Sequence, residues 1–269
     1  MSEEALFQAM CLLYALAALA YLGCLVSRAK ALRPLSVVIL LAAFAFNTAW
    51  LLNRWRIADR PPFKTLYESL IFAAWCIILV YLFVELIYRI KLIGFLSIGM
   101  TLLTLYFAHA QSKSVAKLPA ALQSVWFIPH VVIYFVGYGA LTIAFITSIL
   151  YLIKLKVKAG EGEQLADFDD MTYHATAFGF VFLTFGLVTG AVWAKVAWSD
   201  YWFWDPKEVW SLITWLIYLV YLHLRTMRGW RGRPAAWFVV AGFLAIIITY
   251  LGFNYLPQAQ ESDHAYISE

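Results

Sequence analysis

The sequence is short of charge. Asp, Glu, Lys and Arg make up only 13% of its 269 residues, whereas hydrophobic residues make up 64%. A soluble globular domain carries about 25% charged residues and about 45–50% apolar residues. This shortage of charge excludes a large soluble core and indicates an integral membrane protein.

Cysteine is also scarce, and no two cysteines are close in the sequence. Cys11, Cys24 and Cys76 lie inside apolar runs, and no CxxC motif is present. We therefore expect neither a structural disulfide nor thiol redox chemistry. The net charge is only +4 and the basic residues are scattered among short loops, which argues against a nucleic-acid partner.

The first residues, MSEEALFQAM, lack the basic start and the small-residue cleavage site of a secretory signal peptide. We therefore expect the first apolar run to be retained as a membrane span. The sequence also contains no internal repeat and no low-complexity tract. No segment is long enough and polar enough to form a separate soluble domain.

Long apolar runs fill most of the chain. A transmembrane helix needs about 20 predominantly apolar residues. Eight segments meet this requirement, so we predict an all-α polytopic membrane protein with about eight transmembrane helices. The predicted spans are residues 7–27, 35–53, 66–88, 92–108, 125–153, 173–195, 207–226 and 235–256.

Lys and Arg residues predict the orientation of these spans, because they accumulate in cytoplasmic loops. Of the twenty Lys and Arg residues, twelve lie in the loops after the first, third, fifth and seventh spans. The other eight lie in the loops after the second, fourth and sixth spans. This bias predicts that both chain termini lie outside, together with the loop between the sixth and seventh spans.

That loop is the most distinctive stretch of the chain. Residues 193–215, WAKVAWSDYWFWDPKEVWSLITW, hold six tryptophans in twenty-three residues. An aromatic belt at the membrane interface accounts for one or two of them. The density favours instead a stacking surface for a planar ligand, with Lys195 and Lys207 near enough to meet carboxylates. The tryptophans are Trp193, Trp198, Trp202, Trp204, Trp210 and Trp215.

The sequence Asp-Pro-Lys-Glu within this loop has a structural interpretation. Asp205 suits an N-cap, Pro206 the first helical position, and Glu208 the third position of a capping box. These residues are therefore expected to start the seventh span. The assignment leaves their neighbours open to contact a ligand.

The histidines suggest what that ligand is. His130 and His264 both fall on the predicted outer side, and two imidazoles on opposite faces of a macrocycle are able to ligate iron. His223 is 19 residues beyond Trp204, or about 28 Å of helix, so it suits a second site near the inner leaflet. His109 and His174 are more simply interpreted as hydrogen-bonded residues near an interface, with no role in ligand binding.

Four stretches carry a resemblance that covers most of residues 61–254. They are PPFKTLYESLIFAAW, LQSVWFIPHVVIYFVGYGAL, FGFVFLTFGLVTGAVWA and GAVWAKVAWSDYWFWDPKEVWSLITWLIYLVYLHLR. Together they resemble the CcsA (ResC) family, the haem-handling membrane subunit of system II cytochrome c synthases. The chain is similar, more distantly, to the CcmC and CcmF families.

The resemblance implies cytochrome c biogenesis. Haem b would cross the membrane and sit on the external tryptophan ("WWD") segment, where its vinyl groups form thioethers with a CxxCH apocytochrome c. His130 and His264 match the family's external ligands, and His223 matches its histidine within a span. The implied partner is the CcsB (ResB) membrane subunit, which supplies a second histidine-bearing span. The implied cofactor-binding residues are Trp193, Trp198, Trp202, Trp204, Asp205, Lys207, Glu208 and Trp210.

The resemblance also divides the chain into an N-terminal pair of spans (1–60), an assembly domain (61–256) and an external tail (257–269). Two features depart from the family pattern. Ser199 replaces the glycine of a Trp-Gly pair, so glycine-favoured backbone conformations are not expected there. The tail before His264 is longer than usual and lacks a following glycine.

Three functions remain open at this point. The chain is a synthase subunit, a haem exporter or chaperone with no part in ligation, or a structural or quinone-binding anchor. No acid–base residue for catalysis stands out, so enzymatic activity is left open. A bacterial cytoplasmic membrane is favoured over a thylakoid membrane, with the active face outside.

Overall fold

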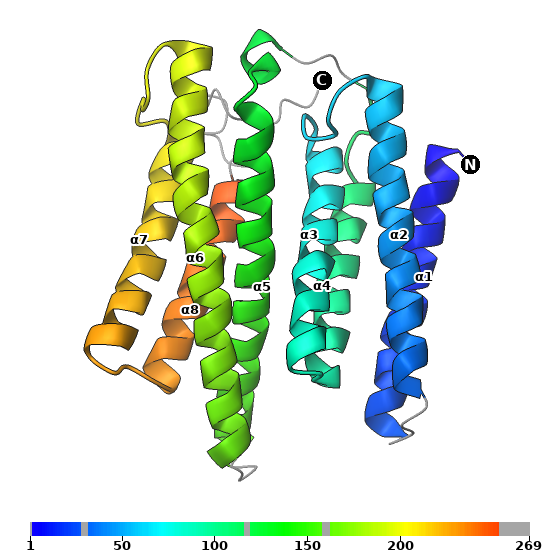
Figure 1. Ribbon diagram of the computed structural model, residues 1–269, viewed down its shortest axis with the longest axis vertical. Helices are drawn as coiled ribbons and strands as arrows, with labels where there is room; N and C mark the ends of the chain where they lie inside the picture. Colours follow the sequence, from blue (N-terminus) through cyan, green and yellow to red (C-terminus); the bar gives the residue numbers. More distant parts are fainter. Residues whose placement is uncertain (1, 28–31, 116–118, 158–161, 253–269) are drawn as a thin grey trace. The chain divides into compact units, whose positions relative to one another are not determined.

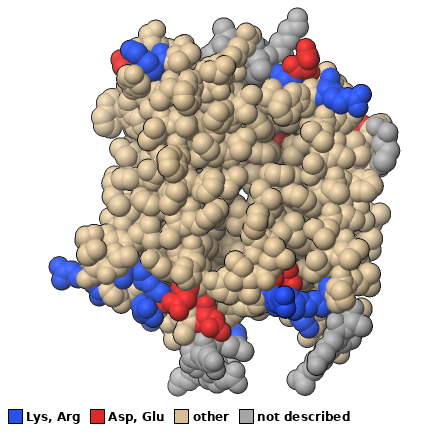
Figure 2. Space-filling model, in the orientation of Figure 1, with Lys and Arg blue, Asp and Glu red and all other residues tan. Residues whose placement is uncertain are grey.

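The computed structural model describes residues 2–27, 32–115, 119–157 and 162–252 (Figure 1). All regular secondary structure in these ranges is helical, and eight of the helices are long and apolar enough to cross a membrane. The predicted all-α polytopic fold is thereby confirmed. On the face shown in Figure 2, charged side chains lie at the helix ends and leave the helix middles uncharged. His264 lies outside the described residues.

The chain forms two compact units, and the first covers Met1–Leu118. Each helix of this unit follows its predecessor after a short connection, as expected for antiparallel neighbours. The first helix packs against the second and fourth, and the third packs against the fourth. The helices are α1 (Glu3–Val26), α2 (Leu32–Ala58), α3 (Leu66–Ile87) and α4 (Lys91–His109).

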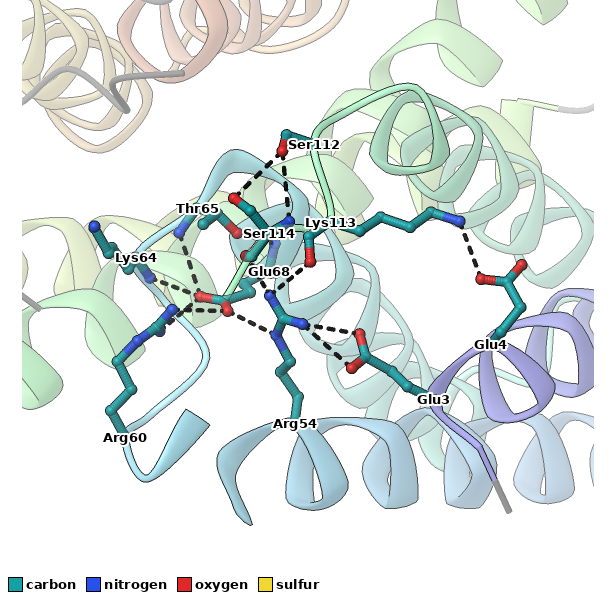
Figure 3. A network of polar contacts seen from close by, with 10 residues as sticks. All are labelled: Glu3, Glu4, Arg54, Arg60, Lys64, Thr65, Glu68, Ser112, Lys113 and Ser114. Atoms are coloured by element: carbon teal, nitrogen blue, oxygen red, sulfur yellow. Dashed lines mark hydrogen bonds and ion pairs between the residues drawn. The ribbon is translucent and has the colours of Figure 1, made fainter. Parts of the chain in front are cut away.

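One end of unit 1 holds a cluster of buried charges (Figure 3). The carboxylate of Glu68 is 0% exposed and accepts from Arg54 Nε and Arg60 Nη1, both at 2.8 Å. Arg54 also pairs with Glu3 at 3.2 Å and donates to the Ser114 carbonyl at 2.7 Å. This cluster joins α1, α2, α3 and the segment after α4.

The second unit covers the described residues from Pro119 onward. Its helix α5 packs most extensively against α6, while α8 packs against both α5 and α7. The elements are the 3-10 turn η1 (Ala120–Gln123), the helices α5 (Phe127–Val157), α6 (Gly162–Trp198), α7 (Pro206–Met227) and α8 (Arg233–Ile247), and the π-helical turn η2 (Ile248–Gly252).

Glycines allow α5 and α6 to approach closely. A Cβ at Gly179 would lie 2.7 Å from Cγ of Leu141, and one at Gly137 would lie 3.1 Å from Cβ of Phe182. Small residues let helix backbones come together where lipid supplies no hydrophobic driving force. The absence of side chains at Gly137 and Gly179 therefore allows α5 and α6 to pack closely.

Several helices extend beyond the predicted spans, most of all at the start of α6. The predicted span begins at residue 173, whereas α6 begins at Gly162. The intervening segment is acidic, so a hydropathy window rejects it, although Glu, Gln, Leu and Ala are good helix formers. Similarly, α2 runs to Ala58 instead of residue 53, and its last turns carry Arg54 into the charge cluster.

Candidate functional site

His130 and the tryptophan segment lie at the same end of unit 2. His130 is in the first turns of α5, and its ring stacks on Trp193 of α6 with centroids 5.5 Å apart and planes at 25°. Tyr134 meets the same imidazole edge-on at 5.0 Å. The structure therefore joins the predicted external histidine to the first predicted tryptophan.

A hydrogen bond fixes the tautomer of His130. Its Nδ1 lies 3.0 Å from the carbonyl oxygen of Gly186. Because a carbonyl only accepts, Nδ1 must carry the hydrogen, and a neutral imidazole then keeps its lone pair on Nε2. Metal-binding histidines commonly show this arrangement, in which the other ring nitrogen donates to a carbonyl or carboxylate.

Space for this imidazole comes from glycines on α6. A Cβ at Gly190 would lie 2.6 Å from Cε1 of His130, and a Cβ at Gly186 would lie 2.6 Å from Cδ2 of Tyr134. Any larger residue at Gly190 would have to displace the histidine ring. Gly190 thus leaves the space for the His130 ring, and Gly186 leaves the space for the Tyr134 ring beside it.

The loop between α6 and α7 is bounded by two left-handed residues. Ser199 has φ 72° and Trp204 has φ 59°, although neither is glycine. The expectation that Ser199 avoids a glycine-favoured conformation was therefore wrong. Lys195 Nζ donates to the Ser199 carbonyl at 2.8 Å and lies 5.4 Å from the centroid of the Tyr201 ring. This ammonium stabilises the turn, so it is engaged within the loop.

The predicted capping box at the start of α7 is confirmed. Oδ1 of Asp205 accepts from the Lys207 amide at 2.8 Å. Oε2 of Glu208 accepts from the amides of Phe203 at 2.9 Å and Asp205 at 3.2 Å. Both carboxylates are therefore used to hold the loop, and Lys207 itself is partly buried.

The tryptophans separate into three environments. Trp193 is 4% exposed and meets Trp198 edge-on at 4.9 Å, so its ring contacts both His130 and Trp198. Trp202 and Trp204 meet at 84° with centroids 5.9 Å apart, and Trp204 is 70% exposed. The rings of these edge-on pairs do not lie in one plane, so they differ from the single flat surface expected for stacking.

The remaining tryptophans lie on α7. Trp215 donates its indole N–H to Thr184 at 2.9 Å and stacks on Phe180, so it joins α7 to α6. Trp210 is partly buried. The indole N–H of Trp202 is buried and has no hydrogen-bond partner among the described residues.

The other histidines lie apart from His130. His223 is exposed near the opposite end of α7, and within the described ranges its ring makes no hydrogen bond or ring contact. His109 stacks on Phe7 in unit 1, with centroids 5.7 Å apart. His174 lies against Tyr173 on α6. The described residues contain no group of three or more His, Cys, Asp and Glu side chains suited to a metal ion.

Sequence reasoning missed an ion cluster at the end of unit 2 opposite the tryptophan loop. The guanidinium of Arg225 pairs with Asp169 at 2.5 Å and with Asp170 at 3.0 Å. Asp169 also accepts from the amide of Gly232 at 2.9 Å. Arg225 within the seventh span was the signal in the sequence that could have predicted this cluster. Charged residues within spans are rare and nearly always paired.

Comparisons with known proteins agree with this architecture. Residues 63–259 match the family described as Cytochrome C assembly protein. The chain is 39% identical over 223 residues to the Cytochrome c biogenesis protein CcsA of Chlamydomonas reinhardtii, covering 79% of this chain and 63% of that protein. It is 38% identical over 240 residues to CcsA of Prochlorococcus marinus, covering 78% of each chain.

A solved structure gives the same fold. The Cytochrome c Heme Lyase CcmF superposes with a TM-score of 0.71 at 17% identity, covering 92% of this chain and 46% of that one. This chain thus spans less than two thirds of the algal relative and less than half of the lyase. By its sequence match over residues 63–259 and its identity to CcsA proteins, the chain belongs to the cytochrome c assembly protein family.

Proposed function

We propose that this protein carries haem across the membrane and presents it for covalent attachment to a CxxCH apocytochrome c. The single observation that carries the proposal is the bond from His130 Nδ1 to the Gly186 carbonyl. It prepares an imidazole for iron at the end of unit 2 that bears the tryptophan loop. Family membership and the names of the CcsA relatives support the same activity.

At this site the substrate is haem b, and His130 is one axial ligand. His264, which lies outside the described residues, is the second ligand in our proposal. Trp198, Trp202 and Trp204 enclose the macrocycle, with exposed Trp204 on the solvent side. Asp205 and Glu208 act through the loop, because they fix its backbone, and Trp193 backs the histidine.

The attachment chemistry needs little from this chain beyond position. A cysteine S–H of the apocytochrome adds across a haem vinyl group, with sulfur on one vinyl carbon and hydrogen on the other. The addition consumes no oxidant or reductant. The protein's contribution is to hold the vinyl edge towards the thiols, which raises the rate through proximity and orientation. A covalent cytochrome that forms only when this chain is present would make the chain a synthase subunit.

His223 is the proposed inner ligand. Its ring is exposed on α7 and makes no polar contact among the described residues, which suits a site completed by another chain. We propose the CcsB (ResB) membrane subunit as that partner. The host membrane in this proposal is a bacterial cytoplasmic membrane, with both termini and the tryptophan loop outside. Residues 61–256 form the assembly domain and 257–269 the external tail.

Co-expression with the partner subunit and a CxxCH apocytochrome tests the proposal. We expect a haem-bound complex with a Soret band and a covalent cytochrome detected by haem stain after denaturation. A haem-loaded protein without covalent cytochrome would favour the exporter. A complex without a Soret band, in cells supplied with haem, would leave only a structural or quinone-binding anchor.

A further inference from the structure

Helix α7 carries a continuous polar stripe. Polar residues recur along it at alternating intervals of four and three, the spacing that keeps side chains on one helix face. In the structure this face is turned into unit 2, because four of its members are buried. The stripe consists of Lys207, Ser211, Thr214, Tyr218, Tyr221 and Arg225.

The stripe is long enough to cross the membrane. From Lys207 to Arg225 the chain advances eighteen residues, or about 27 Å at about 1.5 Å per residue. The hydrocarbon core of a bilayer is about 30 Å thick. The opposite face of α7 is apolar and exposed, as at Leu216 and Val220. The polar side chains of α7 thus point into the bundle, where they need hydrogen-bond or ion-pair partners.

Three buried hydroxyls, two in the middle of the stripe and one on the facing helix α6, lack a well-formed hydrogen bond within the described ranges. Thr176 Oγ1 on α6 and the hydroxyls of Tyr218 and Tyr221 are buried, and none of them closes a hydrogen bond of good geometry with a described residue. The Thr176 and Tyr221 hydroxyls lie close to each other across α6 and α7 without forming such a bond. The residues are 0%, 0% and 2% exposed. A buried hydroxyl without a partner destabilises the folded state, because it has lost its hydrogen bonds to water. Three such groups on adjacent turns of two packed helices therefore require an explanation.

Satisfied hydroxyl pairs flank this gap on both sides. Thr147 and Thr172 lie 2.8 Å apart between α5 and α6, towards the Arg225 end. Thr214 and Thr249 lie 3.2 Å apart between α7 and η2, towards the tryptophan loop. The polar lining thus continues beyond the unpartnered hydroxyls in both directions, so they are the middle of one seam and not isolated defects.

The helix packing also makes room for this polarity. A Cβ at Gly242 on α8 would lie 2.6 Å from Cζ of Tyr218. Glycine at this position lets the Tyr218 ring lie within the bundle. A phenylalanine would fill the same space without a buried hydroxyl, so packing alone does not explain tyrosine here.

We propose that unit 2 binds a chain of water molecules that bridges Thr176, Tyr218 and Tyr221 within the membrane. Water suits these groups because each hydroxyl both donates and accepts, and no charged side chain lies in the middle of the stripe to hold an ion. Buried waters typically make about three hydrogen bonds to groups that otherwise lack partners. This inference uses only the core of unit 2 and does not rest on the proposed haem function.

The sign of a stability change tests the proposal. In a dry site, Tyr218→Phe removes an unsatisfied hydroxyl, and the unfolding temperature of the purified full chain stays the same or rises. In a hydrated site, the bound water loses a partner, and we expect a fall of about 2–4 °C. Tyr221→Phe is expected to behave alike. Tyr106→Phe is the control, because Tyr106 is 71% exposed on α4.

A measurement on the unchanged protein keeps the test independent of folding defects. Pulsed X-ray radiolysis forms hydroxyl radicals from bound water, which oxidise adjacent tyrosines. We expect Tyr218 and Tyr221 to be oxidised in the intact protein. Tyr21 is the matched control, since it is 0% exposed and its hydroxyl is bonded to Tyr81 at 3.2 Å. Protection of Tyr218 and Tyr221 equal to that of Tyr21, or a rise in the unfolding temperature of Tyr218→Phe, overturns the proposal.

Discussion

His130 donates its Nδ1 hydrogen to the carbonyl oxygen of Gly186 across a distance of 3.0 Å. Four residues further along α6, Gly190 leaves the space that the imidazole occupies. Two residues of α6 thus position His130 of α5. Gly186 acts through its carbonyl oxygen, and Gly190 acts through the space that its missing side chain leaves. Substitutions at Gly190 and at His130 separate this positioning from the role of the imidazole itself.

Gly190→Ala is expected to lower haem retention without removing any ligand. The added Cβ would lie 2.6 Å from Cε1 of His130, so the ring must move off Trp193 and Gly186. The ratio of Soret absorbance to protein in the purified complex measures the effect. Gly99→Ala is the matched control, because a Cβ there has no neighbour within 4 Å. Equal haem content in the two variants would contradict the positioning role of Gly190.

On the proposed function, His130→Ala is expected to lose most of the haem bound near the tryptophan loop, with partial recovery when imidazole is added to the growth medium. Free imidazole would replace the proposed ligand but not the positioning by Gly186. The pyridine haemochrome assay of the purified complex measures bound haem. His174→Ala is the control, because His174 lies on α6 away from the tryptophan loop. Unchanged haem in His130→Ala would exclude it as a ligand.

Ser199→Gly is expected to stabilise the protein by about 1 kcal/mol, because a left-handed conformation costs a non-glycine residue roughly 1–2 kcal/mol. Ser199 has φ 72°. The unfolding temperature of the purified chain measures the change. Ser124→Gly is the opposite case, since Ser124 has φ −70° and ψ 140°, and glycine there should lower stability by about 0.5 kcal/mol. A fall for both variants would contradict the strain at Ser199.

Glu208→Ala is expected to free the loop before α7. It removes the acceptor for the amides of Phe203 and Asp205 and costs about 1–2 kcal/mol. Hydrogen exchange at these two amides, read by mass spectrometry of loop peptides, should accelerate. Glu208→Gln keeps an acceptor oxygen and should exchange more slowly than the alanine variant. Identical exchange in both variants would show that the capping box does not hold the loop.

Glu68→Ala is expected to destabilise the protein by about 3–5 kcal/mol, because it leaves two buried guanidinium groups without their shared carboxylate. Glu4→Ala is the control, since the exposed pair between Glu4 and Lys113 should contribute about 0–1 kcal/mol. Chemical unfolding of the two purified variants compares them. Similar midpoints would mean that the cluster in Figure 3 contributes no more than a surface pair.

Local signals in the sequence were sufficient for much of the fold. Apolar length found all eight spans, and the Asp205–Glu208 capping box predicted where α7 begins. Both depend on residues within a few positions of one another. The start of α6 at Gly162 was missed because hydropathy marks where a helix enters the membrane, whereas helix propensity decides where it begins.

Contacts between distant residues were beyond such signals. His130 and Gly186 are 56 positions apart, as are Arg225 and Asp169. No spacing rule links them without the packing of α5, α6 and α7. The left-handed Ser199 was missed for a related reason, because its preference as a serine is overridden by the turn that Lys195 holds. The sequence thus predicted the helices and the capping box, whereas the contacts of His130, Arg225 and Ser199 depend on the packing of distant residues.

The pair between Arg225 and Asp169 has a consequence for how the protein is made. The ribosome completes Asp169 and Asp170 before it reaches Arg225. When α7 leaves the translocon, the counter-charges for its arginine already stand on α6. A helix with a polar inward face and the lowest hydropathy of the eight spans therefore need not enter lipid alone, because the preceding helix is there to receive it.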